Sequence, residues 1–129
     1  MADCSREKKH SFVWNELLSI DVEADKKFYT EVFGWEAETV NMPSGAYTRF
    51  LLNGEYIAGM MQNCDKDAKK SIWVSYVTVE DVEQSLNKAV SSGANIIVPK
   101  MLIENIGIIG MVNTKSGSLV GFFQTLPQS

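Results

Sequence analysis

The heptapeptide YIAGMMQ at residues 56–62 returns as SLVGFFQ at residues 118–124. In both copies apolar residues flank a central glycine, and both copies end in glutamine. A second pair lies at nearly the same offset, because LLSIDVE at residues 17–23 is answered by VTVEDVE at residues 77–83. A repeat of about 60 residues that occurs only twice indicates duplication within one domain, since a solenoid needs roughly three or more units. The sequence therefore predicts two copies of one module.

Composition and charge narrow the class of protein. The chain has 129 residues, enough for one domain with a sizeable core. Its formal net charge of −4 disfavours nucleic acid or an anionic membrane surface as a partner. There is no apolar run of about 18 residues and no apolar signal segment at the start, so neither a membrane span nor export is expected. The two cysteines form no CxxC pair and no disulfide framework, which predicts a cytoplasmic protein.

The first half is expected to run strand, helix and three strands. Asp21 suits the N-cap of the helix, and Gly34 suits the left-handed residue that ends it. One helical stripe is apolar, as in an amphipathic helix, and consists of Ala24, Phe28, Val32 and Phe33. The other expected segments are a disordered tail at 1–11, strands at 12–19, 35–42, 46–52 and 56–62, and a connector at 64–70.

The second half is expected to repeat this order. Its helix lies between Asp81 and Gly93, with an inward stripe formed by Val82, Leu86, Ala89 and Val90. Its strands are expected at 72–79, at 95–98 where Pro99 stops the strand, at 103–112 and at 119–124. The two modules then cover residues 12–63 and 71–125 of a single domain over 12–129.

The predicted fold class is α+β, with two βαβββ modules in tandem forming a pseudo-twofold, incomplete barrel around a shared cavity. A module with one helix covers only one face of its sheet, so the other face must be buried against the second module or border a cavity. Gly59 and Gly121 fall at equivalent central positions, where a missing side chain leaves room. The alternative is that these glycines only relieve crowding.

Four segments give the chain a family resemblance. They are residues 14–18 (WNELL), residues 21–35 with the phrase FYTEVFGW, residues 57–61 (IAGMM) and residues 73–81 (WVSYVTVED). With them the chain resembles the vicinal oxygen chelate superfamily of glyoxalase I, bleomycin-resistance proteins and extradiol dioxygenases, over nearly the whole length from Phe12 to Gln124. The resemblance implies paired βαβββ modules around a cavity, a small-molecule ligand and a homodimer. It does not fix a substrate, because one fold carries many functions.

The resemblance also implies a metal site, with one ligand from the first strand and one from the last strand of each module. On this sequence those positions hold Trp14, Gly59, Val74 and Gly121. None of these side chains can coordinate a divalent metal. The only histidine, His10, precedes the first strand and is expected to be solvated. We therefore expect no metal and no other cofactor.

Two side chains are candidates for chemistry in the cavity. The family register points Glu16 inward, where a desolvated carboxyl could transfer a proton or hydrogen-bond a ligand. Tyr76 has the corresponding position in the second module and could donate a hydrogen bond to the same ligand. The remaining candidate ligand-binding residues line the same predicted face, and they are Trp14, Leu18, Ile57, Gly59, Met61, Val74, Leu119, Gly121 and Phe123.

Structural alternatives to these roles stay open. Glu16 could pair with Arg49 or with a tyrosine, or it could lie at a wet barrel mouth. Tyr47 and Arg49 share one face of a strand, but the sequence does not say which face. The apolar candidates are equally consistent with plain core.

Two functions follow from this pattern. The first is a glyoxalase- or bleomycin-resistance-like protein that binds a small organic molecule between the modules without a metal. The alternative is a metal-independent enzyme of the isomerase or lyase type that uses Glu16 and Tyr76.

Overall fold

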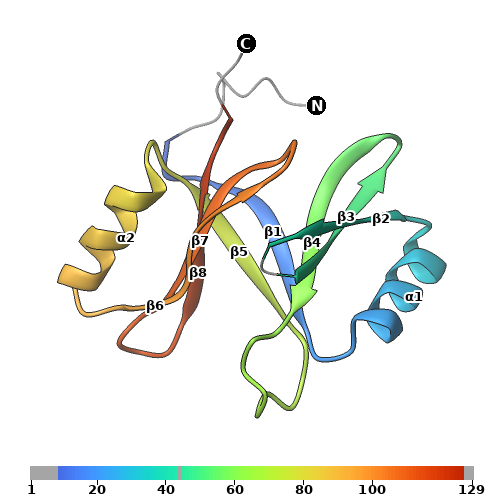
Figure 1. Cartoon of the computed structure of the whole chain (residues 1–129), viewed down its shortest axis with the longest axis horizontal. Coiled ribbons are helices and arrows are strands. Elements are labelled where there is room, and N and C mark those ends of the chain that lie inside the picture. Colours follow the sequence, from blue (N-terminus) through green and yellow to red (C-terminus); the bar gives the residue numbers. More distant parts are fainter. Residues whose placement is uncertain (1–8, 44, 127–129) are drawn as a thin grey trace. The chain divides into compact units, whose positions relative to one another are not determined.

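The computed structural model describes residues 9–43 and 45–126, and within them the predicted element order is confirmed. A strand, a helix and three strands occur twice, which gives an α+β fold built from two βαβββ repeats (Figure 1). The first repeat consists of β1 (Phe12–Ser19), α1 (Val22–Phe33), β2 (Glu36–Met42), β3 (Gly45–Leu52) and β4 (Glu55–Gln62). The second consists of β5 (Ile72–Thr78), α2 (Val82–Ser91), β6 (Asn95–Ile103), β7 (Gly107–Asn113) and β8 (Leu119–Gln124).

The chain forms two compact units, which are described separately. The first unit is Asn15–Val74, and the second combines residues 9–14 with residues 75–126. No helix in the described residues is long and apolar enough to cross a membrane.

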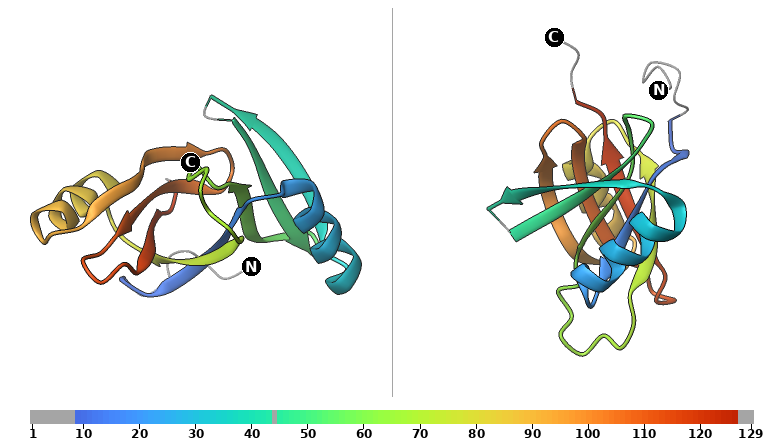
Figure 2. Two further views of the ribbon diagram at one scale, coloured as in Figure 1. Left: turned by 90° about the horizontal axis from the view of Figure 1, so that it is seen from below. Right: turned by 90° about the vertical axis from the view of Figure 1, so that its right-hand side faces the viewer.

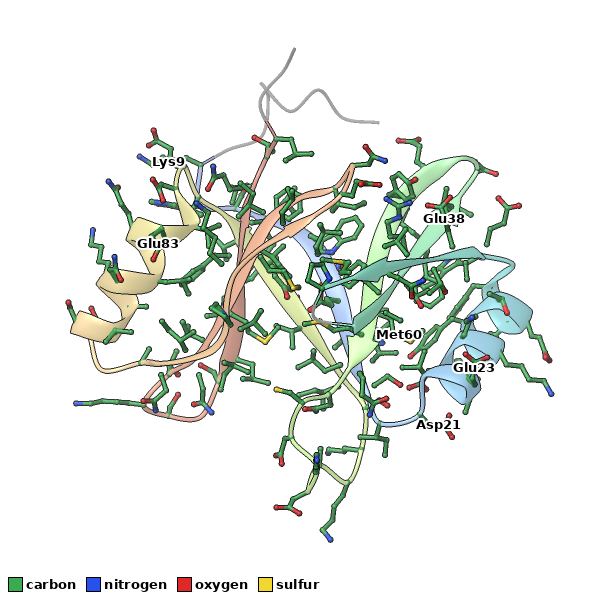
Figure 3. The ribbon with its side chains drawn as sticks, viewed as in Figure 1. Lys9, Asp21, Glu23, Glu38, Met60 and Glu83 are labelled. Atoms are coloured by element: carbon green, nitrogen blue, oxygen red, sulfur yellow. The ribbon has the colours of Figure 1, made fainter. Side chains whose placement is uncertain are left out.

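The sheet of the first unit has the strand order β2-β3-β4-β1. Strand β1 pairs in parallel with β4, placing Glu16 opposite Gly59, and the other neighbours are antiparallel. One face carries a core cluster of Leu17, Phe50, Ala58 and Met60 (Met60 is labelled in Figure 3). Helix α1 begins as predicted, because the Asp21 side chain accepts a hydrogen bond from the Ala24 N–H at 3.1 Å. It ends at Gly34, which has the left-handed φ of 72°.

The apolar stripe of α1 does not face the sheet. Phe28, Val32 and Phe33 are 51%, 56% and 54% exposed, and no residue of α1 is fully buried. The helix instead packs through Val22 and Tyr29. The ring of Tyr29 stacks on Trp35 and lies against Phe50 and Trp73. The Tyr29 hydroxyl accepts a hydrogen bond from the Trp73 indole N–H at 2.9 Å. Apolar residues occupy two sides of this helix, so helical spacing alone could not identify the buried side.

The second unit repeats the arrangement with the strand order β5-β8-β7-β6. Strand β5 pairs in parallel with β8 and places Tyr76 opposite Gly121, just as β1 and β4 pair Glu16 with Gly59. The matching registers support the duplication read from the two heptapeptides.

Helix α2 packs on β6 and β7 (Figures 1 and 2). Val82 and Leu86 are buried in its interface and Ala89 packs against them, as predicted. Val90 was predicted to face inward, but it is 47% exposed. The Gln124 side chain accepts a hydrogen bond from the Val82 N–H at 2.9 Å, so the glutamine that ends the second heptapeptide supports the first turn of α2.

Two strand boundaries differ from prediction by more than one residue. Strand β6 continues through Pro99 to Ile103, because it lies at the edge of the sheet, where a residue without an N–H is tolerated. Its pairing with β7 shifts register on both sides of Val98. Strand β7 then starts only at Gly107, after a turn in which Asn105 has a positive φ of 65°.

The expected tail ends earlier than residue 11. The His10 N–H donates to the Thr78 carbonyl at 2.9 Å, and the Thr78 N–H donates to the Ser11 carbonyl at 2.8 Å. These backbone bonds attach residues 10 and 11 to the end of β5. Residues 1–8 of the predicted tail lie outside the described residues.

Candidate functional site

A row of polar positions crosses all four strands of the first unit, on the face opposite its core cluster. Pairing places Glu16 beside Gly59, Gly59 beside Arg49, and Arg49 beside Glu38. Directly paired residues project from the same face of a sheet, so these four positions form one line. Glu16 has no exposed surface, and Arg49 is only 4% exposed. A buried carboxyl group and a buried guanidinium therefore lie on the same sheet face.

The partner of Glu16 is a tyrosine that sequence reasoning could not place. The Tyr47 hydroxyl donates a hydrogen bond to Glu16 Oε1 at 2.9 Å, and both side chains are buried. The Tyr47 ring lies over Gly59, because a Cβ added there would come within 1.7 Å of the phenolic oxygen. The absent side chain of Gly59 thus makes the space in which Tyr47 reaches Glu16. One alternative weighed from sequence, a Glu16–tyrosine pair, is present in the structure.

Arg49 and Glu38 form the other end of the row. Its guanidinium forms an ion pair with Glu38 (labelled in Figure 3) and lies 4.7 Å from the centre of the Tyr56 ring. The Tyr56 hydroxyl donates to the same Glu38 carboxylate at 3.0 Å, and this hydrogen bond raises the pKa of Tyr56. Arg49 is thus enclosed by a carboxylate and an aromatic face, the environment in which a guanidinium is readily buried.

Ile57 lies on the opposite face from the one predicted for it. Phe50 pairs with Ala58 and Leu51 pairs with Tyr56, so Ile57 is the extra residue of a β-bulge. Ile57 packs against the core cluster beneath α1, while Tyr56 reaches the Arg49 side. The sequence reasoning assumed strict alternation along β4, which the bulge breaks.

Other predicted residues stay near the polar row. Leu18 and Met61 are paired between β1 and β4, and Met61 is also paired with Tyr47. Leu18 is buried and Met61 is half-buried. Val74, at the end of this unit, is buried.

In the second unit, Tyr76 fills the space over a glycine. Tyr76 is fully buried, and a Cβ added at Gly121 would lie 2.3 Å from its ring. Trp14 and Phe123 form a second aromatic contact, with ring centroids 6.1 Å apart. Leu119, at the start of β8, is half-buried. Each of the two predicted open positions, Gly59 and Gly121, is therefore occupied by a tyrosine ring, which favours the alternative that these glycines relieve crowding.

The residues present do not fit the metal site that the resemblance implies. Trp14, Gly59, Val74 and Gly121 offer no side-chain oxygen, sulfur or imidazole nitrogen as a ligand. In the described part of the chain, no group of three or more His, Cys, Asp or Glu side chains could hold a metal ion.

The described residues of the second unit line at least two cavities. One has a volume of about 360 Å³ and is lined by Lys9, Thr78, Val79, Glu80, Phe123, Gln124 and Thr125. A larger groove of about 520 Å³ runs beside α2, over Val77, Val79, Ala89 and Phe122. Phe123 is the predicted site residue that borders one of these cavities.

Solved structures with similar folds include enzymes. Methylmalonyl-CoA epimerase from Mycobacterium tuberculosis has a TM-score of 0.63, with 12% identity, over 90% of this chain and 88% of that one. The protein BH1468 from Bacillus halodurans C-125 has a TM-score of 0.63, with 10% identity, over 95% of this chain and 99% of that one. Identities this low show that the fold is shared and show nothing of the activity.

Sequence comparison identifies the family. "Putative glyoxylase CFP32" of Mycobacterium tuberculosis (strain CDC 1551 / Oshkosh) is 32% identical over 115 residues, which are 86% of this chain and 44% of that protein. "Anthracycline biosynthesis protein DnrV" of Streptomyces peucetius is 26% identical over 119 residues, 81% of this chain and 43% of that protein. The chain thus spans less than half the length of these relatives. The model of one family matches residues 11–122, so the chain belongs to the Glyoxalase/Bleomycin resistance protein/Dioxygenase superfamily, as the resemblance predicted.

Proposed function

We propose that this protein binds a small organic molecule without a metal ion, on the face of the first unit that carries Glu16. The observation that supports the proposal is the buried hydrogen bond from Tyr47 to Glu16 at 2.9 Å. A carboxyl group is rarely buried without a specific reason, because desolvation disfavours its charged form. Such groups are concentrated at binding and catalytic sites. The superfamily, and a relative named for anthracycline biosynthesis, favour a small organic molecule as the ligand.

The chemistry of this face defines what the ligand must offer. The Tyr47 hydroxyl donates to Glu16 Oε1, and the two oxygens of a carboxylate together offer about four acceptor sites, so a ligand hydroxyl or N–H can donate to the same carboxyl group. Leu18 and Met61 supply apolar surface next to it, and thioether side chains adapt to flat or aliphatic groups. The ligand is therefore an apolar molecule with at least one polar hydrogen.

A second candidate is a metal-independent isomerase or lyase. The hydroxyl of Tyr47 within hydrogen-bonding distance of Glu16 favours it, because a phenol and a carboxyl group in contact can relay a proton. Glu16 would act as the base, with Tyr47 setting its orientation. Tyr76, the partner expected from sequence, remains a candidate within the second unit.

Native mass spectrometry of the protein purified from its own host tests the proposal first. The spectrum should show a carried small molecule, and it also reads the oligomeric state, for which a homodimer is our prediction. Where no molecule is carried, bleomycin, an anthracycline and methylmalonyl-CoA form a probe panel taken from the named relatives. A protein that carries nothing and binds none of the three would refute the proposal.

Glu16→Gln then separates binding from catalysis. The amide keeps the shape and can still hydrogen-bond, so affinity should fall by no more than roughly 10-fold if Glu16 only binds. Proton transfer would collapse by roughly 100-fold or more. The matched control is Glu36→Gln on exposed β2, which should change neither quantity.

A further inference from the structure

The indole N–H of Trp14 is buried in the second unit without a hydrogen-bond acceptor. The side chain is 8% exposed, and among the described residues Nε1 has no partner. Its ring packs beside Phe123 at 6.1 Å, with the two planes tilted by 35°. An indole nitrogen can only donate, so nothing but an acceptor atom can satisfy it.

The indole N–H of Trp73, in the first unit, provides a comparison because it has a hydrogen-bond acceptor. Trp73 is 40% exposed, yet its Nε1 donates to the Tyr29 hydroxyl at 2.9 Å. A half-exposed indole is thus paired within the protein, whereas the buried one is not. Buried indole N–H groups normally find a partner, and an unpaired one destabilises the folded protein. A bound molecule that brings an oxygen acceptor to Trp14 would remove this penalty and gain affinity from it.

The surroundings of Trp14 indicate the kind of molecule. Phe123 borders both the Trp14 ring and the cavity of about 360 Å³, a volume within the usual range for small-molecule sites. Phe123 is the aromatic residue among those that line this cavity, and its ring favours a flat ring system as a partner for stacking or edge-to-face packing.

We propose that Trp14 is a ligand-binding residue whose indole N–H donates a hydrogen bond to a carbonyl oxygen of a flat aromatic molecule packed against Phe123. Quinones and aromatic ketones have this chemistry, because their carbonyl oxygen lies in the plane of the ring. The inference rests on the proposed function in one respect, since it takes the ligand to be a small organic molecule, and it names the class of molecule that would bind at this place in the second unit.

Two matched probes isolate the carbonyl group. Anthraquinone-2-sulfonate and anthracene-2-sulfonate have the same outline, but only the first carries carbonyl oxygens. Isothermal titration calorimetry of the wild-type protein should show about 2- to 12-fold tighter binding of the quinone than of the anthracene, the range expected for one hydrogen bond. Trp14→Phe keeps an aromatic ring and removes the N–H, so the preference should disappear while affinity for the anthracene stays within about 2-fold. Trp73→Phe is the matched control and should keep the preference.

A second measurement needs no variant to fold. In a ¹H–¹⁵N spectrum of the wild-type protein, the Trp14 indole signal should move downfield as the quinone is added and stay in place with the anthracene. Equal affinity for both probes, binding of neither, or a preference that survives in Trp14→Phe would overturn the inference. The proposed function fails by a different result, namely a protein that carries no molecule and binds none of the panel.

Discussion

Replacing Gly59 by alanine should break the contact on which the candidate site depends. The new Cβ would lie 1.7 Å from the Tyr47 hydroxyl oxygen and 2.5 Å from the ring carbon that bears it. Tyr47 must then leave its position, and its hydrogen bond to Glu16 is lost. Overpacking costs about 1–3 kcal/mol, and an unmade hydrogen bond at a buried carboxyl group adds about 1–3 kcal/mol. We expect Gly59→Ala to lower the free energy of unfolding by about 2–6 kcal/mol.

Urea denaturation measures this loss, and a double-mutant cycle assigns it to the tyrosine. In a Tyr47→Ala background the space over Gly59 is open, so adding Gly59→Ala should cost less than about 1 kcal/mol. A loss below about 1 kcal/mol for Gly59→Ala in the wild-type background would contradict the geometry. So would an equal loss in both backgrounds, because the cost would then be intrinsic to the strand.

Three further outcomes are expected from urea denaturation. Gly121→Ala should cost about 1–3 kcal/mol, because its Cβ would meet the buried Tyr76 ring at 2.3 Å; a neutral effect would mean that this ring moves freely. Asp21→Ala removes the N-cap of α1 and should cost about 0.5–2 kcal/mol, and no change would show that the cap bond is not formed in solution. The hydrogen bond and charge of Lys9 lower the pKa of Glu80. The ion pair therefore adds to the free energy of unfolding above about pH 4, and this addition is lost as the pH falls further. Glu80→Gln should therefore differ from the wild type at pH 7 and match it near pH 2, and a difference that persists in acid would rule out the ion pair as its cause.

The repeat and its register could be predicted from the sequence. The two heptapeptides placed Gly59 and Gly121 at equivalent points, and each indeed pairs with the first strand of its own repeat. Short turn and capping signals are local, so Asp21 and Gly34 marked the ends of α1 correctly. Such features depend on neighbouring residues, which the sequence displays directly.

The composition of the site depended on contacts that the sequence does not display. One bulge in β4 places Ile57 on the core side and Tyr56 against Arg49. No residue pattern in the sequence predicts this bulge. Tyr47 and Arg49 are two residues apart on β3, which predicts that they share a face of the sheet. Only the pairing of β3 with β4 fixes which face that is. Glycine has no side chain to compare, so the sequence could not say whether a ligand or a protein ring fills the space beside it.

The most direct test of the central claim is the affinity for the carried or panel ligand after removal of divalent metals. Protein dialysed against EDTA, and confirmed by elemental analysis to hold no stoichiometric Zn, Ni, Fe or Mn, should bind that ligand as tightly as untreated protein. Glu16→Gln should then weaken binding in both preparations alike, because the carboxyl group acts on the ligand itself. A fall in affinity of about 10-fold or more after EDTA treatment, reversed by adding one divalent metal, would contradict metal-free binding.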